Sequence, residues 1–168
     1  MKNHFELFGL TPAYALETES LERSYREIQS RIHPDRYAHA GDAERRASMQ
    51  WTTRVNEAYR TLKSPVQRAK YLLEMNGVDV QFETSTQMPS AFLLQQLELR
   101  EALAGAKQPE ALDELLAEVR RQQRLLEQGI AQLIDGSKDY AAAAGEVRKL
   151  MFLDKLAAEI DLAYDGVE

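Results

Sequence analysis

Apolar residues recur at helical spacing along almost the whole of this 168-residue chain, and no stretch alternates convincingly between apolar and polar residues. Leu21, Tyr25, Ile28 and Ile32 follow one another at intervals of four, three and four residues, which places them on one face of a helix. Strands in a sheet need an alternation with a period of two, so this pattern argues against strands. The sequence therefore predicts an all-α protein.

A rigid corner is predicted between two of these helices. A second apolar stripe is formed downstream by Trp51, Val55, Ala58 and Leu62. Two amphipathic helices joined by a polar loop predict an antiparallel hairpin, and the tripeptide His33-Pro34-Asp35 lies at its tip. Pro34 has no backbone N–H, fixes its own φ and pushes His33 out of the helical region. The corner is expected to present an imidazole and a carboxylate to water, which suits binding a partner better than catalysis.

Local signals set several helix boundaries. Thr18 is expected to cap the first helix of the hairpin, which ends at Ile32, and the second is expected from about residue 42 to residue 63. Ser64, Pro65 and Gln67 occupy the N-cap, N1 and N3 positions of a further short helix. Gly77 suits the left-handed position that follows the end of this helix.

The second half of the chain predicts a separate bundle. We expect a first domain at residues 1–76, a linker at residues 77–89 and a second domain at residues 90–168. Three long helical patterns with short connections predict an antiparallel three-helix bundle, in which Pro109 opens the second helix and Ser137 can cap the third. The apolar stripe of the second helix is expected to be Leu112, Leu116, Val119, Leu126, Ile130 and Leu133.

Two features of this bundle do not fit simple core packing. In the first helix, Phe92, Leu99 and Leu103 share one side, and the opposite side carries Leu93, Leu94 and Leu97 beside Glu98 and Glu101. In the third helix, Phe152 lies off the stripe that faces the core. A helix that is apolar on two sides is either sandwiched between layers or docked to something else. These residues could pack against the first domain, or they could form a partner site with an apolar centre and an acidic rim.

Charge is distributed unevenly along the chain. Residues 1–80 carry 12 basic and 11 acidic side chains, a net charge of +1, and residues 81–168 carry 9 basic and 16 acidic side chains, a net charge of −7. The acidic second half argues against nucleic acid as a partner. Arg26, Arg31 and Arg36 surround the helix that precedes the corner, together with Arg23. They form either an ordinary solvated helix face or a surface for electrostatic steering.

Several functional classes are disfavoured. The chain has no cysteine, so it cannot ligate zinc or an iron–sulfur cluster through thiolates. No apolar run is long enough to span a membrane, and the N-terminus lacks a signal-peptide pattern, so a cytoplasmic protein is expected. A metal-dependent hydrolase using His33, Asp35, His39 and Asp42 would need pocket walls that this short loop does not predict. No Gly-rich phosphate-binding loop occurs, and neither an enzyme nor a cofactor is expected.

Several segments together resemble a known family. The segments Phe5–Leu10, Tyr25–Arg36 and Val55–Leu62 resemble a J domain. The segments Ala91–Glu101 and Val147–Leu156 add a resemblance to the HscB family of iron–sulfur cluster assembly co-chaperones, and the likeness covers nearly the whole chain. The resemblance implies an N-terminal J domain followed by a C-terminal three-helix bundle, and it implies that the chain is not an enzyme.

The resemblance also implies two partners. The J domain would dock on an ATPase chaperone of the HscA/DnaK class and accelerate its ATP hydrolysis, with His33, Pro34 and Asp35 as the trigger and Arg26, Arg31 and Arg36 as steering residues. The bundle would bind the iron–sulfur scaffold protein IscU, and the matching positions are Leu93, Leu94, Leu97, Glu98, Glu101 and Phe152. The alternative is a J-domain co-chaperone whose bundle binds a different client.

One departure from the family's pattern and one difference from eukaryotic relatives bear on this expectation. Bacterial relatives often carry Met at the position of Leu94, an exchange that roughly conserves volume. Some eukaryotic relatives carry an N-terminal cysteine motif for metal, and this chain has none, which indicates the bacterial type.

Overall fold

The computed structural model describes residues 2–80 and 88–167, and within these ranges every regular element is helical. The elements are α1 (His4–Leu7), α2 (Thr18–Ile32), the 3₁₀ turn η1 (Pro34–Tyr37), α3 (Asp42–Lys63), α4 (Pro65–Met75), α5 (Ser90–Gly105), α6 (Pro109–Ala131), the π-helical turn η2 (Gln132–Gly136), α7 (Tyr140–Ala163) and the 3₁₀ turn η3 (Tyr164–Gly166). The prediction of an all-α fold is confirmed.

The chain divides into two compact units, residues 1–72 and residues 73–168. The predicted linker at residues 77–89 lies largely outside the described residues, since residues 81–87 are not among them. The domain boundaries at residues 76 and 90 therefore stay predictions.

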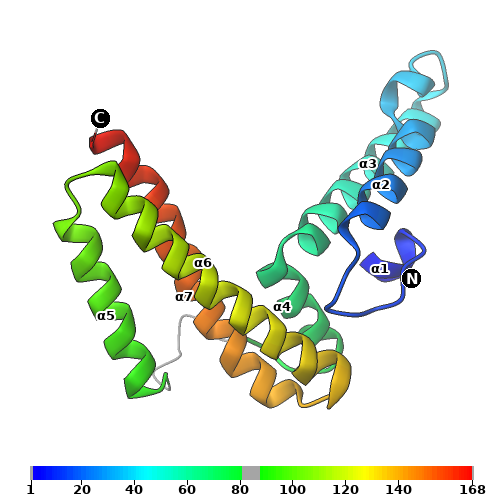
Figure 1. Ribbon diagram of the computed structural model, residues 1–168. Helices are drawn as coiled ribbons and strands as arrows, with labels where there is room; N and C mark the ends of the chain where they lie inside the picture. Colours follow the sequence, from blue (N-terminus) through cyan, green and yellow to red (C-terminus); the bar gives the residue numbers. More distant parts are fainter. Residues whose placement is uncertain (1, 81–87, 168) are drawn as a thin grey trace. The chain divides into compact units, whose positions relative to one another are not determined.

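In the N-terminal unit, α2 and α3 form the expected antiparallel hairpin, and α1 lies beside them (Figure 1). The core between these helices is largely apolar, and Phe5 of α1, Leu21 of α2 and Leu62 of α3 are completely buried in it. Tyr25 stacks on Tyr59 with ring centroids 3.9 Å apart, which adds an aromatic contact between the two arms. The tip of the hairpin is therefore supported by two helices that pack against each other.

Two predicted helix boundaries are confirmed by their hydrogen bonds. The backbone N–H of Gln67 donates to the hydroxyl of Ser64 at 3.2 Å, as expected for an N-cap. Gly77 has φ +77°, and the N–H groups of Gly77 and Val78 donate to the carbonyls of Glu74 and Leu73 at 3.1 and 2.8 Å. This pair of bonds is the Schellman motif, which satisfies two carbonyls at the end of α4.

Two predicted caps are wrong by one or two residues. Thr18 is the first residue of α2 rather than its cap, because Glu17 occupies the N-cap without a side-chain hydrogen bond. Ser137 does not cap α7, because Asp139 accepts a bond from the N–H of Ala142 at 3.2 Å instead. The π-helical turn before Ser137 postpones the start of the last helix, and a carboxylate serves the cap as well as a hydroxyl does.

In the C-terminal unit, α6 and α7 lie side by side and α5 runs along them (Figure 1). The core is built from completely buried residues of both long helices, among them Leu112, Val119, Ile130, Leu150, Leu153, Leu156 and Ile160. Leu99 and Leu103 of α5 are partly buried against this core, as the sequence predicted. These contacts agree with the prediction that the second half of the chain forms a three-helix bundle.

The stripe of α6 differs from its prediction at two positions. Leu115 is buried and Leu116 only partly so, and Ile134 is buried where Leu133 was expected. α6 is flanked by two helices, so its buried face is broader than a single stripe. η2 is a π-helical turn, in which each hydrogen bond spans five residues. Ile134, four positions after Ile130, therefore faces nearly the same side as Ile130 and is buried with it.

Candidate functional site: an exposed corner and an exposed leucine face

The corner lies at the tip of the hairpin and exposes the predicted side chains. His33 has φ −55° and ψ 134°, the extended conformation that a residue before proline prefers. Its Nδ1 accepts the backbone N–H of Asp35 at 3.2 Å and lies 3.6 Å from the Asp35 carboxylate. The Asp35 side chain is 92% exposed and the His33 side chain 50% exposed. The turn thus fixes the imidazole on the backbone and leaves the carboxylate open to a partner.

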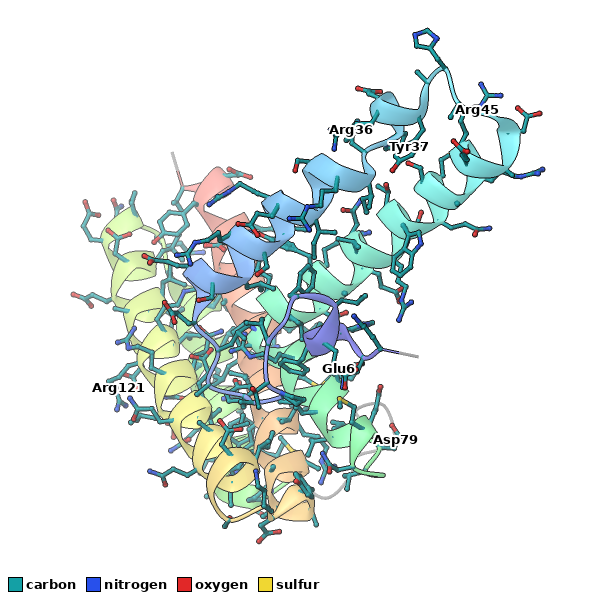
Figure 2. The ribbon with its side chains drawn as sticks, turned by 90° about the vertical axis from the view of Figure 1, so that its right-hand side faces the viewer. Glu6, Arg36, Tyr37, Arg45, Asp79 and Arg121 are labelled. Atoms are coloured by element: carbon teal, nitrogen blue, oxygen red, sulfur yellow. The ribbon has the colours of Figure 1, made fainter. Side chains whose placement is uncertain are left out.

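The end of α2 is held by side chains from the turn that follows it. The last carbonyls of a helix have no partner within the helix. Here the Arg36 guanidinium donates to the carbonyl of Ser30 at 3.0 Å, and the Tyr37 hydroxyl lies 3.4 Å from the carbonyl of Arg31. Figure 2 shows Arg36 and Tyr37 at the tip of the hairpin. Arg36 therefore has a structural contact in addition to its predicted role in steering.

The last carbonyl of α2 is satisfied from the other arm of the hairpin. The buried Ser48 hydroxyl of α3 donates to the carbonyl of Ile32 at 2.5 Å, and the Thr52 hydroxyl lies 3.4 Å from the same oxygen. The Thr52 hydroxyl donates at 2.8 Å to the carbonyl of Ser48 in its own helix, so the Ser48 hydroxyl makes the hydrogen bond that fixes where α2 ends and His33 begins. Sequence reasoning missed both hydroxyls, although a detectable signal existed, since Ser48 and Thr52 precede Val55 at helical spacing on the inward side of α3.

The predicted steering residues are exposed. Arg26 and Arg31 lie on α2 and Arg36 on η1, and all three have exposed side chains. Arg23, one turn before Arg26, is exposed as well. Electrostatic attraction to an acidic surface acts mainly on the rate of encounter, so exposed guanidinium groups near the corner are suited to it.

The alternative metal site gains no geometric support. Among residues 2–80 and 88–167, no three His, Asp or Glu side chains are close enough together to hold a metal ion. In the same ranges, no helix is both long and apolar enough to cross a membrane.

One side of α5 is exposed. Leu93, Leu94 and Leu97 are 45%, 57% and 53% exposed, and Glu98 and Glu101 beside them are exposed too. The opposite side of α5 carries Leu99 and Leu103 against the core and, unexpectedly, a buried Gln96. We name the five exposed residues the leucine face. The other helices of the C-terminal unit therefore leave this face uncovered, and its role as a partner site stays a prediction.

Phe152 has a structural contact that the sequence did not reveal. It is partly buried, and its ring meets the Phe92 ring edge to face with centroids 6.2 Å apart. An ion pair between Arg100 and Glu159, at 2.5 Å, joins the same two helices. Phe152 therefore links α7 to α5, so any contribution to partner binding comes in addition to a contribution to stability.

Comparison with known proteins connects this arrangement to one family. Residues 88–161 match the family model described as the HSCB C-terminal oligomerisation domain. A co-chaperone protein HscB homolog of Ralstonia nicotianae is 52% identical over 168 residues, which cover 98% of this chain and 96% of the relative. The structure of chaperone HscB from Vibrio cholerae is 34% identical with a TM-score of 0.87, and the match covers 99% of this chain and 100% of that one.

A human structure extends the likeness to eukaryotes. The co-chaperone protein HscB of human shares 26% identity and a TM-score of 0.93 over 98% of this chain and 83% of that one. The fold is therefore maintained although about three quarters of the residues differ.

Proposed function

The chain belongs to the HscB family of co-chaperones, and from this membership we propose that it binds the iron–sulfur scaffold protein IscU and presents it to an HscA/DnaK-class chaperone whose ATPase it stimulates. In this proposal the protein acts in the cytoplasm during iron–sulfur cluster assembly and transfer. The chain belongs to a family of co-chaperones rather than of enzymes, so the ATP is hydrolysed by the partner.

The observation that carries the proposal is the exposure of the leucine face. Three leucines are half exposed on a helix whose other side already packs on the core of the bundle. A contiguous apolar surface with a polar rim is typical of a protein-binding site. Glu98 and Glu101 are exposed beside the leucines on α5 and supply that rim, and the proposed site also includes Phe152 of α7, whose ring contacts Phe92.

The corner supports the second half of the proposal. The exposed carboxylate of Asp35 stands on a turn that is anchored by Arg36 and Ser48. A pre-ordered turn loses little conformational freedom on binding, which favours recognition of a small exposed motif. We propose His33, Pro34 and Asp35 as the trigger and Arg26, Arg31 and Arg36 as steering residues.

Joining the two sites in one chain explains the proposed delivery step. A scaffold held by the C-terminal unit stays near the chaperone that the N-terminal unit has bound. Linking two binding events in this way raises the local concentration of the second partner to about the millimolar range. ATP hydrolysis and client capture are thereby coupled without any new contact.

Separate substitutions test the proposed chaperone-binding site and the proposed scaffold-binding site. Asp35→Asn is expected to abolish stimulation of the HscA-type ATPase and to leave IscU binding unchanged. Asp42→Asn is the matched control, because Asp42 is another exposed carboxylate near the tip. A folded Asp35→Asn variant with normal stimulation would refute the trigger assignment.

A triple alanine variant at Leu93, Leu97 and Phe152 tests the proposed scaffold-binding site. It is expected to lose IscU in a pull-down and to retain stimulation of the ATPase by its J domain. Leu162→Ala is the control, because this leucine of α7 is 71% exposed and lies outside the proposed site. Loss of a different client instead of IscU would keep the J-domain assignment and replace the cargo.

A further inference from the structure

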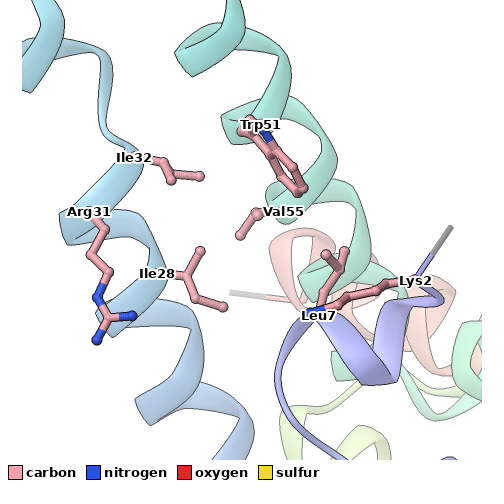
Figure 3. A pocket seen from close by; sticks show the side chains of 7 residues that line it. All are labelled: Lys2, Leu7, Ile28, Arg31, Ile32, Trp51 and Val55. Carbon is pink, nitrogen blue, oxygen red and sulfur yellow. The ribbon is translucent and has the colours of Figure 1, made fainter.

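An apolar pocket lies between the arms of the hairpin, apart from the trigger residues. It has a volume of about 340 Å³ and belongs entirely to the N-terminal unit. Its floor and walls come from Leu7 of α1, Ile28 and Ile32 of α2, and Trp51 and Val55 of α3 (Figure 3). Ligand pockets in proteins usually measure about 300–1,000 Å³, so this one fits one or two amino-acid side chains rather than a large cofactor.

The wall formed by Trp51 is exposed and yet held in place. Trp51 is 46% exposed and is the only tryptophan of the chain. The Arg54 guanidinium lies over its ring at 5.4 Å, and the same guanidinium donates to the carbonyl of Lys2 at 2.6 Å. These contacts tie the indole, the start of the chain and α3 together. The wall is therefore ordered before any ligand arrives, which lowers the entropic cost of binding.

The rim of the pocket is positively charged. Lys2 and Arg31 line the pocket from two different edges, and its seven lining residues include no acidic side chain (Figure 3). The Arg54 guanidinium, which lies over the Trp51 ring, is a third positive charge close to the pocket. An apolar centre between two cationic edges complements an apolar side chain that has carboxylates on both sides.

From this match we propose that the pocket binds a segment of a partner protein in which a leucine-sized side chain is flanked by acidic residues. The side chain enters between Ile28, Val55 and Trp51, and the carboxylates face Lys2 and Arg31. Large apolar anchors in pre-formed pockets carry much of the affinity of such contacts, while charges at the rim select the partner. The inference concerns a surface beside the trigger and holds whether or not the scaffold assignment of the leucine face is right.

The single tryptophan provides the assay. The full chain is titrated with an acetylated and amidated eight-residue peptide in which two central leucines are flanked by three glutamates on each side. We expect a saturable change in Trp51 emission and a matching heat by calorimetry. Binding should weaken when salt is raised from about 0.1 M to about 1 M, because the screening length falls from about 10 Å to about 3 Å.

Peptide and protein variants serve as controls. One control peptide carries lysines in place of the glutamates, and another carries alanines in place of the leucines; both are expected to bind at least tenfold more weakly. Arg31→Glu should weaken binding of the glutamate–leucine peptide about tenfold, whereas Arg23→Glu, a change at an exposed site of α2 outside the pocket, should not. Circular dichroism checks that both variants are folded.

Several outcomes would overturn the inference. The inference is wrong if millimolar peptide causes neither an emission change nor heat. It is also wrong if the lysine peptide binds as tightly as the glutamate peptide, or if Arg31→Glu and Arg23→Glu weaken binding equally. A change of Trp51 emission with protein concentration alone would also overturn it, because the occupant would then be a second copy of this chain. Normal ATPase stimulation combined with any of these results would leave the proposed function intact.

Discussion

Truncating Leu97 is expected to separate binding from stability. Leu97 is 53% exposed, so about half of its side chain is already in water. Complete burial of a leucine contributes about 1.5–3 kcal/mol, and an open site leaves no cavity when the side chain is shortened. Leu97→Ala should therefore lower the free energy of unfolding by less than about 1 kcal/mol.

The same change should weaken IscU binding much more than it weakens the fold. An apolar residue at the centre of an interface contributes about 1–3 kcal/mol, which corresponds to about a 5- to 150-fold increase in Kd. Isothermal titration calorimetry with IscU measures the Kd, and thermal unfolding followed by circular dichroism measures stability. Leu156→Ala is the reference for a core residue, because Leu156 is completely buried and its truncation should cost about 2–5 kcal/mol.

Phe152→Ala should behave differently from Leu97→Ala. The Phe152 ring is partly buried and contacts Phe92, so its loss should cost about 1–3 kcal/mol of stability as well as affinity. The reasoning would be refuted if Leu97→Ala lowered the melting temperature as much as Leu156→Ala does. An unchanged Kd for Leu97→Ala would refute it equally.

Three further changes test the local architecture. Ser48→Ala removes a buried hydroxyl from the last carbonyl of α2 and should destabilise the N-terminal unit by about 1–2 kcal/mol in urea unfolding followed by Trp51 fluorescence. Gly77→Ala forces a side chain onto a residue at φ +77° and should cost about 1–2 kcal/mol in thermal unfolding. The bond from the Tyr164 hydroxyl to Asp113 raises the pKa of Tyr164 to about 12. Because an unfolded tyrosine ionises near pH 10, the stability from this bond is fully present below about pH 10 and is lost as pH rises to about 12.

Each of these changes has a matched control. Ser48→Thr keeps a hydroxyl and should restore most of the stability that Ser48→Ala loses, so equal losses would contradict the role of the hydrogen bond. Gly105→Ala lies at the end of α5 with open space around it and no positive φ, so it should not destabilise. In an absorbance titration at high pH, Tyr164→Phe should remove the tyrosinate that appears near pH 12, and Tyr140→Phe should leave it in place.

Helix type and most helix limits followed from the sequence because they depend on neighbours along the chain. The corner at His33, the start of α4 at Pro65 and the left-handed Gly77 that follows the end of α4 each rest on a backbone preference of one or two residues. The two caps that were wrong, Thr18 and Ser137, lie where several polar residues compete for one position. The family resemblance also rested on short continuous segments of the sequence.

The function of several side chains was decided only by tertiary structure. The sequence placed Phe152 off the core, yet its contact with Phe92 depends on how α5 lies against α7. Ser48 anchors a carbonyl that lies 16 positions earlier in the chain, and the pocket beside Trp51 needs three helices to form. A local pattern records which face of a helix is apolar, but it does not record which distant residue meets that face. Packing between elements makes that choice, and with it the difference between a residue that supports the fold and one that is free to bind.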